Sequence, residues 1–257
     1  MKTLQFRYDA VLEFDAPVTE HTFLLRCIPQ SLPEQSTLGL THSVWPAVTG
    51  GAYSKDGFGN VVYTGRIGAK HERFEYTVEG QVLRNDAARL KEDYMPCYLY
   101  PSALTQSCRE IDGFLSGIRP AGTAVEKALT IARELHVYMT YESGTTDVDT
   151  TAAEAFRRRS GVCQDFAHVF IAACRRMEIP ARYVSGLVVG EGESHAWAEV
   201  WEDGLWYGMD PTAGHEADER YIKLCVGRDY TDCPLSRGIF SGPAAQTQKI
   251  SAKVTEV

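Results

Sequence analysis

The sequence predicts an α+β fold in two regions, a β-rich region over residues 1–112 and a mixed region over residues 113–257. Short alternating or β-branched runs dominate the first region. Apolar residues at helical spacing begin near residue 121, and three strand-like runs follow between residues 182 and 210. Helices in one block followed by strands in another favour an α+β arrangement over a doubly wound parallel sheet.

Four strands are expected in the first region, and they are Leu4–Leu12, Thr22–Ile28, Asn60–Ile67 and Phe74–Val82. Clusters of Pro, Gly and Asp separate these runs, as is typical of turns. The segment Asp56-Gly57-Phe58-Gly59-Asn60 predicts a tight turn, because its glycines accept positive φ and its Asp and Asn cap locally. We therefore expect a sandwich or a small barrel of antiparallel strands here.

The second region begins with a helix expected over residues 121–141. Its apolar stripe consists of Val125, Leu129, Ala132, Leu135 and Met139. A short helix follows, where Thr151 and Glu154 have the spacing of a capping box. A further helix is expected from Cys163 to Met177, between Ser160-Gly161 and Pro180. The expected strands are Arg182–Val189, His195–Trp201 and Leu205–Asp210, with a last one near Lys249–Val254.

Composition restricts the classes of function. The chain is 44% hydrophobic, enough to bury a core without disulfides or a structural metal. Its formal net charge of −8 argues against a nucleic-acid partner. No apolar run is long enough for a signal peptide or a membrane span, so we expect a cytoplasmic protein with no membrane partner. The seven cysteines form no C-x-x-C pair, which argues against zinc, and most, such as Cys174 and Cys225, are expected to be buried thiols.

Cys163 is the candidate nucleophile, because it opens the predicted helix. The partial positive charge at a helix N-terminus favours thiolate over thiol. The free backbone N–H groups of the first turn can also donate to an oxyanion formed when the thiolate attacks a carbonyl. A cysteine at a helix start is more often structural, so this assignment requires a basic partner.

His195 is the candidate base, and Asp210 is the candidate carboxylate that orients it. Asp203-Gly204 predicts a two-residue type I′ hairpin turn, which places Glu202 opposite Leu205 and Trp197 opposite Asp210. His195 then lies on the same face as Asp210 and diagonal to it, about 7 Å away at Cβ. A three-residue turn would place the two on opposite faces.

Three further residues are weaker candidates. His168 lies five residues along the helix from Cys163, about 140° around the axis, so we expect it to pack or to face solvent. His215 is a rival for contact with a substrate. Asp165 is interpreted as a charge at the helix N-terminus or as a hydrogen-bond acceptor behind the nucleophile.

Four segments, in this order and spacing, resemble the bacterial transglutaminase-like superfamily. They are Gly161–His168, Ile179–Gly186, Ser194–Val200 and Met209–Thr212, and the likeness extends to Gly227–Tyr230 and to the β-rich N-terminal region with Asp56–Asn60. The resemblance implies a papain-like core and no cofactor, and it assigns the catalytic roles to Cys163, His195 and Asp210. The animal crosslinking enzymes of this superfamily carry a G-x-C-W motif, in which tryptophan follows the nucleophile. This chain resembles them less closely, because Gln164 follows Cys163 and no calcium loop is visible. Both differences argue against calcium-dependent crosslinking.

Three functions stay open at this stage. A cysteine peptidase or amidase would resolve its thioester with water, and we favour this function. An acyl transferase of the protein-glutamine γ-glutamyltransferase type would resolve the same thioester with an amine. A binding protein built on the same core would need no triad, but all three triad residues are present. The expected partner is a peptide or amide substrate.

Overall fold

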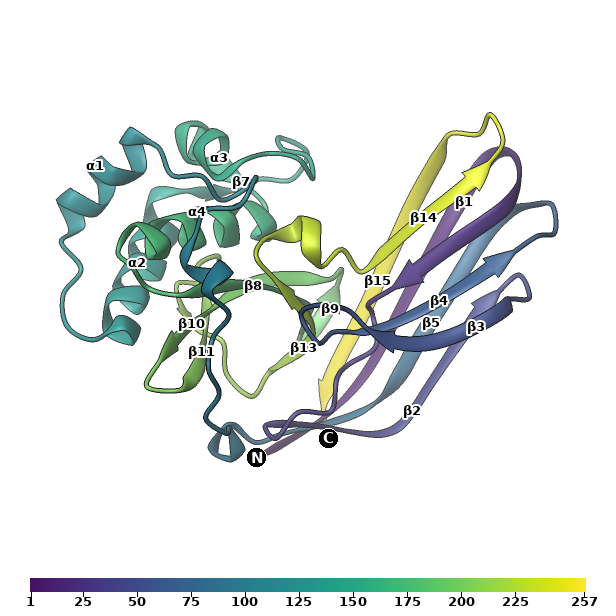
Figure 1. Cartoon of the computed structure of the whole chain (residues 1–257), viewed down its shortest axis with the longest axis horizontal. Helices are drawn as coiled ribbons and strands as arrows, with labels where there is room; N and C mark the ends of the chain where they lie inside the picture. Colours follow the sequence, from purple (N-terminus) through teal and green to yellow (C-terminus); the bar gives the residue numbers. More distant parts are fainter.

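The computed structural model describes all 257 residues. A curled antiparallel sheet forms one half of the molecule, and four helices packed on a second sheet form the other half (Figure 1). This arrangement confirms the predicted α+β class. No helix combines the length and the apolar character that crossing a membrane requires.

The first sheet is organised around its first strand, β1 (Lys2–Leu25). Alternate side chains of β1 are buried, from Leu4 to Phe14, because successive residues of a strand point to opposite faces. The first half of β1 pairs with β5 (His71–Arg84) and β15 (Gln246–Glu256), and its second half with β4 (Val61–Ile67) and β14 (Ser236–Ser241). The other strands are β2 (Gln35–Trp45) beside β5, β3 (Thr49–Lys55) beside β4, and β9 (Gly190–Gly192) beside β15.

The predicted strands of this region are present, with two differences. Leu4–Leu12 and Thr22–Ile28 fall largely on the single long strand β1, which continues through the irregular stretch between Glu13 and Val18. β2 and β3 were not predicted. Every residue of β3 is exposed, and β2 buries only its first, so neither carries the apolar alternation that marks a half-buried strand.

The chain returns to the first sheet at its C-terminal end. β14 and β15 both pair with β1, so residues 236–256 belong to the first sheet and not to the region that begins at residue 113. The division into 1–112 and 113–257 therefore does not separate the two sheets, because a single boundary cannot describe a chain that leaves a sheet and comes back to it.

The second half packs helices against the sheet β12-β11-β10-β8-β13. Its helices are α1 (Arg109–Ile118), α2 (Ala124–Tyr138), α3 (Ala152–Arg158) and α4 (Cys163–Arg176). Its strands are β8 (Ala181–Val188), β10 (His195–Glu202), β11 (Leu205–Asp210), β12 (His215–Glu216) and β13 (Tyr221–Gly227). The short elements are the parallel pair β6 (Thr140–Tyr141) and β7 (Ser160–Gly161), and the 3-10 turns η1 (Asp86–Ala88), η2 (Pro96–Leu99) and η3 (Tyr230–Asp232).

α4 is the central helix, and every residue from Asp165 to Arg175 is buried. The predicted Thr151–Glu154 capping box is present at the start of α3. α2 is shorter than predicted because Thr123 and Glu126 form a capping box that fixes its start. The helix α1 was not predicted; its Gly113 and Gly117 weaken the helical signal.

Two amide side chains join the halves at the outer edge of the second sheet. Asn60, which ends the predicted Asp56–Asn60 turn, accepts from the Val226 N–H at 2.8 Å and donates to the Val226 carbonyl at 2.7 Å. Gln35 makes the same pair of bonds with Lys223, each at 2.8 Å. The edge strand β13 is thereby capped by side chains that imitate a neighbouring backbone.

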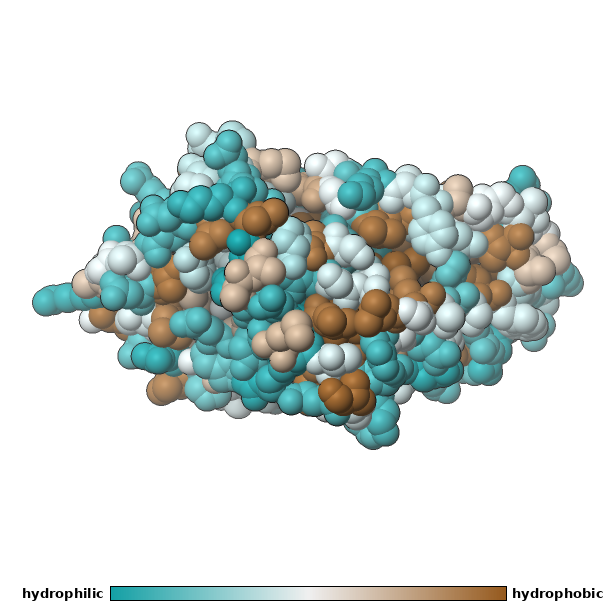
Figure 2. All heavy atoms as spheres, turned by 90° about the horizontal axis from the view of Figure 1, so that it is seen from below, coloured by the Kyte–Doolittle hydropathy of each residue, from teal (hydrophilic) through white to brown (hydrophobic).

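Figure 2 shows one face of the molecule, where hydrophobic residues are interspersed with hydrophilic ones.

Candidate active site

Cys163 is the first residue of α4, and a buried carboxylate shapes the turn that leads into it. Asp165 accepts from the Val162 N–H at 2.7 Å and from the Thr146 hydroxyl at 2.7 Å. Asp165 is therefore a hydrogen-bond acceptor behind Cys163, one of the two interpretations that the sequence suggested. A side chain at Gly161 would collide with this carboxylate, so the close approach requires glycine. The N–H groups of Cys163 and Gln164 belong to the first helical turn, where no intrahelical acceptor exists.

The hairpin between β10 and β11 has the predicted register. Glu202 pairs with Leu205 and Ala198 with Met209, so the next pair along the ladder is Trp197 with Asp210. Asp203 has φ 50° and Gly204 φ 92°, as a type I′ turn requires. His195 and Asp210 consequently share a face, and His195 Nε2 lies 2.7 Å from Asp210 Oδ2.

Asp210 is almost fully buried, at 2% exposed, and four donors compensate for its burial. They are His195 Nε2, the Tyr221 hydroxyl at 2.8 Å, and the N–H groups of Thr212 at 2.9 Å and Ala213 at 3.3 Å. Burial alone would raise the pKa of Asp210, but these hydrogen bonds and the charge of His195 lower it below its usual value. The structure thus keeps a buried carboxylate ionised beside the imidazole.

His195 lies between Asp210 and Cys163. Burial alone would lower the pKa of His195, but its hydrogen bond with Asp210 and the neighbouring Asp210 and Cys163 groups outweigh burial and raise the pKa to about 10. Because Nε2 is taken by Asp210, Nδ1 is the ring nitrogen left to exchange a proton with the thiol. The ring also stacks on Trp197, with centroids 6.2 Å apart. The arrangement allows the His195 ring to shuttle one proton at Nδ1.

A cavity of about 630 Å³ contains Cys163 and His195, and both halves of the molecule line it. The helical half contributes the start of α4, Tyr141 and the loop from Gly190 to His195. The first sheet contributes Tyr8 of β1 and Gln248, Ile250 and Ala252 of β15. β9 pairs with β15 just before His195, which ties the histidine loop to this wall. The first sheet is therefore one wall of the candidate site.

Two other histidines lie apart from Cys163, His195 and Asp210. His168 is fully buried and accepts from the Tyr230 N–H at 3.1 Å, and burial lowers its pKa to about 4. Of the two expected placements, packing or facing solvent, the structure shows packing in the core. His215 bonds the Glu216 carbonyl at 2.8 Å and does not line the cavity, so the structure does not bring this candidate to the site.

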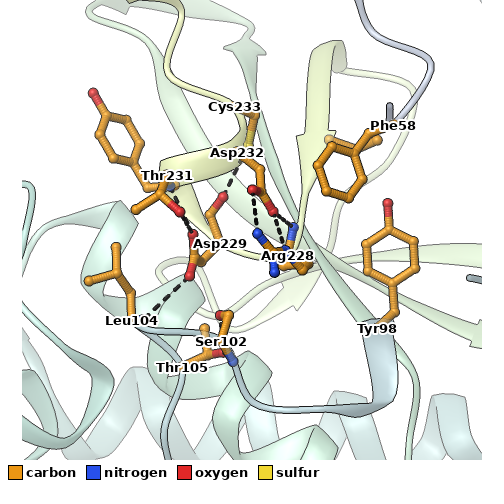
Figure 3. A network of polar contacts seen from close by, with 12 residues as sticks. Phe58, Tyr98, Ser102, Leu104, Thr105, Arg228, Asp229, Thr231, Asp232 and Cys233 are labelled. Carbon is orange, nitrogen blue, oxygen red and sulfur yellow. Dashed lines mark hydrogen bonds and ion pairs between the residues drawn. The ribbon is translucent and has the colours of Figure 1, made fainter. Parts of the chain in front are cut away.

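The segment Gly227–Asp232, which contains the cavity residue Tyr230, forms a network of polar contacts (Figure 3). Asp229 accepts from the N–H groups of Leu104 and Thr231, and Arg228 pairs with Asp232 at 2.8 Å. The network anchors the chain between η2 and α1 and holds Tyr230, a residue of the cavity wall, in position. Its contribution is to the shape of the cavity.

The hydrogen bond from Tyr221 to Asp210 is the site contact that the sequence did not predict. It lies on β13, and its hydroxyl donates to the same Asp210 oxygen that binds His195. No spacing rule connects a tyrosine eleven residues after a carboxylate to that carboxylate.

No group of three or more His, Cys, Asp or Glu side chains lies close enough together to hold a metal ion.

Comparison with known proteins supports the resemblance. The sequence pattern of the Transglutaminase-like superfamily matches residues 113–211, and that of the Bacterial transglutaminase-like N-terminal region matches residues 4–83. The uncharacterised protein ML0607 of Mycobacterium leprae is 31% identical over 267 residues, which cover 95% of each chain. The uncharacterised protein Mb2599c of Mycobacterium bovis is 37% identical over 157 residues, 55% of this chain and 49% of that protein.

A solved structure shares the fold. A Cytophaga hutchinsonii protein that has been proposed to be a cysteine protease superposes with a TM-score of 0.82 and 22% identity, covering 100% of this chain and 91% of its own. The fold and the arrangement of Cys163, His195 and Asp210 define an α+β protein with a cysteine and a histidine–carboxylate pair at one cavity. The chain belongs to the transglutaminase-like superfamily and carries the N-terminal region found in its bacterial members.

Proposed function

We propose that the chain is a cysteine hydrolase that cleaves a peptide or amide bond through a thioester acyl-enzyme. The observation that carries the proposal is the 2.7 Å contact between His195 and the buried Asp210, at the edge of a cavity that also contains Cys163. In this assignment Cys163 is the nucleophile, His195 the base and Asp210 the group that orients the imidazole.

The reaction follows from these positions. His195 Nδ1 takes the proton of Cys163, and the sulfur attacks the carbonyl carbon of the substrate. The N–H groups at the start of α4 donate to the oxyanion that forms. His195 returns the proton to the leaving amine, and the C–N bond breaks to leave the thioester. Water, deprotonated by His195, then releases the acid and restores the thiol.

Water is the acceptor that the cavity favours over an amine. Cys163 is only half-buried, and the lining beside it includes the polar residues Ser143, Gln164 and Ser194. An acyl transferase must keep water from its thioester, which an open polar cleft does poorly. Transfer to an amine is the alternative outcome of the experiment.

The test compares Cys163→Ala with Cys108→Ala, which removes another half-buried thiol outside the cavity. Both variants and the wild type are assayed on peptide and γ-glutamyl amide substrates, with and without an added amine. We expect Cys163→Ala to lose at least about 10³-fold in kcat/KM and Cys108→Ala to keep wild-type turnover. Full activity of Cys163→Ala would refute the proposal. Free acid as the product indicates a hydrolase, and an amine adduct indicates a transferase.

A further inference from the structure

The cavity around Cys163 has an unbalanced charge. Its lining contains two glutamates, Glu191 and Glu193, and no lysine or arginine. Glu191 lies in β9 and Glu193 in the turn between β9 and His195. The remainder of the lining consists of small polar residues and of apolar and aromatic ones, among them Val188, Leu235 and Ile250. An anionic substrate would therefore meet carboxylates here, since His195, the one basic side chain of the lining, is already paired with Asp210.

The two glutamates differ in their partners. Glu191 forms an ion pair with Lys253 of β15 at 2.5 Å, which neutralises much of its charge. Glu193 is exposed and takes part in no ion pair. Glu193 is therefore the uncompensated charge of the cavity wall.

Glu193 also lines the same cavity as Cys163 and His195. It precedes His195 by two residues, and it lines the cavity together with Tyr141 and Cys163. The pKa of Tyr141 is raised by burial and, in addition, by negative charge at Cys163 and at Glu193. Glu193, Tyr141 and Cys163 thus line one cavity, and a substrate bound at Cys163 meets the Glu193 carboxylate on the same wall as His195.

We propose that the cleft selects amide substrates that carry a positive charge beside the reacting carbonyl, with Glu193 as the counter-charge. The ammonium or guanidinium group would pair with Glu193, while an apolar neighbour in the substrate packs against Ile250 and Val188. This inference rests on the hydrolase proposed above, since it specifies the substrate of the same site.

The experiment uses three peptide amides that differ at one position beside the cleaved bond, which holds lysine, norleucine or glutamate. Norleucine keeps the alkyl chain of lysine without its charge. We expect kcat/KM to fall about five- to tenfold from lysine to norleucine and further for glutamate, as one ion pair at a partly exposed site allows. Added salt should reduce the preference, because it screens exposed charges.

Three variants separate the contributions of Glu193 and Glu191 to the preference for lysine over norleucine. Glu193→Gln should bring the lysine-to-norleucine ratio close to one. Lys253→Gln frees the charge of Glu191 and should increase the ratio. Glu134→Gln removes an exposed glutamate of α2 outside the cavity and should leave the ratio at its wild-type value. The two opposite shifts cannot both arise from partial unfolding.

Each outcome decides one proposal. Cys163-dependent turnover without any preference for lysine would overturn the charge selection and leave the hydrolase intact. A preference that survives in Glu193→Gln would also overturn the selection. Turnover that persists in Cys163→Ala would instead overturn the hydrolase, whatever the ratio.

Discussion

Asp210 illustrates how single side chains set the chemistry of the candidate site. An isolated carboxylate is unfavourable at 2% exposure, yet this one is held in its ionised form by four donors. Two of the donors are backbone N–H groups of the turn after Pro211, so the Asp-Pro-Thr sequence itself supplies part of the stabilisation. The other two donors, His195 and Tyr221, bind the same oxygen, Oδ2.

Tyr221→Phe removes one of these donors without changing the shape of the side chain. We expect the loss of about 1–2 kcal/mol of stability, since a hydrogen bond to a charged group is lost, and a fall of about tenfold in kcat/KM. The acid limb of the pH–rate profile should move to higher pH, because the Tyr221 hydroxyl helps to lower the pKa of Asp210. Urea unfolding and pH–rate measurements check both effects.

Tyr207→Phe is the matched control for Tyr221→Phe. Tyr207 lies on β11, next to Gly208 and half-buried, and it does not contact Asp210. We expect its variant to keep the wild-type profile. An acid limb that moves equally in both variants would contradict a positioning role for the Tyr221 hydroxyl.

The raised pKa of His195 makes stability depend on pH. The folded pKa of about 10 lies above the ordinary value of 6.5, so the stabilisation is complete below pH 6.5 and is lost as pH rises through about 10. We therefore expect the free energy of unfolding to fall by a few kcal/mol over this window in the wild type, with about 5 kcal/mol as the upper bound. Denaturant unfolding at several pH values between 6 and 10 measures this slope.

His195→Gln provides the reference for that slope. Glutamine can keep a hydrogen bond to Asp210 but does not titrate, so its stability should change less over the same window. Equal slopes in the two proteins would show that other groups, and not His195, determine the alkaline loss.

At the scale of elements, the packing of β8 between β10 and β13 depends on Gly186. This residue pairs with His195 on one side and with Lys223 on the other. A Cβ at this position would overlap the Trp197 ring and the Ile222 carbonyl. The absence of a side chain lets the Trp197 ring approach β8 closely, and this ring stacks with the His195 ring.

Gly186→Ala should therefore destabilise the fold and disturb the site together. We expect a loss of about 2–4 kcal/mol in urea unfolding, because the backbone carbonyl cannot move aside, and a lower kcat from the displaced Trp197. Gly68→Ala is the control, since a Cβ there meets nothing within 4 Å and its φ is not positive. Similar losses in both variants would show that the close approach at Gly186 has no special effect.

The same elements show what the sequence could predict. α4 and the β10–β11 hairpin follow from local signals, a break before Cys163 and the Asp203-Gly204 turn, and both have the predicted bounds within two residues. The meeting of His195 and Asp210 follows from that register. β2 and β3 escape prediction because they are exposed, and the contacts of Tyr221 and β15 escape it because they join residues that no local pattern connects.

At the scale of the whole molecule, the cleft exists only because the two halves are fixed to each other. β15 completes the first sheet, binds β9 before His195 and lines the cavity. The halves are also joined at the far edge of the second sheet, where Asn60 and Gln35 occupy the free backbone groups of β13. The N-terminal region is thus a structural part of the candidate active site.

Asn60→Ala tests this join. Asn60 is fully buried, and its loss leaves the Val226 N–H and carbonyl and the Gln30 amide without partners. We expect about 3 kcal/mol or more of lost stability, since unpaired buried polar groups lose their full solvation. Asn85→Ala, which removes a half-buried asparagine that makes no capping hydrogen bond, should change stability by less than about 1 kcal/mol. Calorimetry measures both. If the halves depend on each other, Asn60→Ala should lower the temperature of one shared transition, whereas two separate transitions with an unchanged first sheet would contradict the coupling.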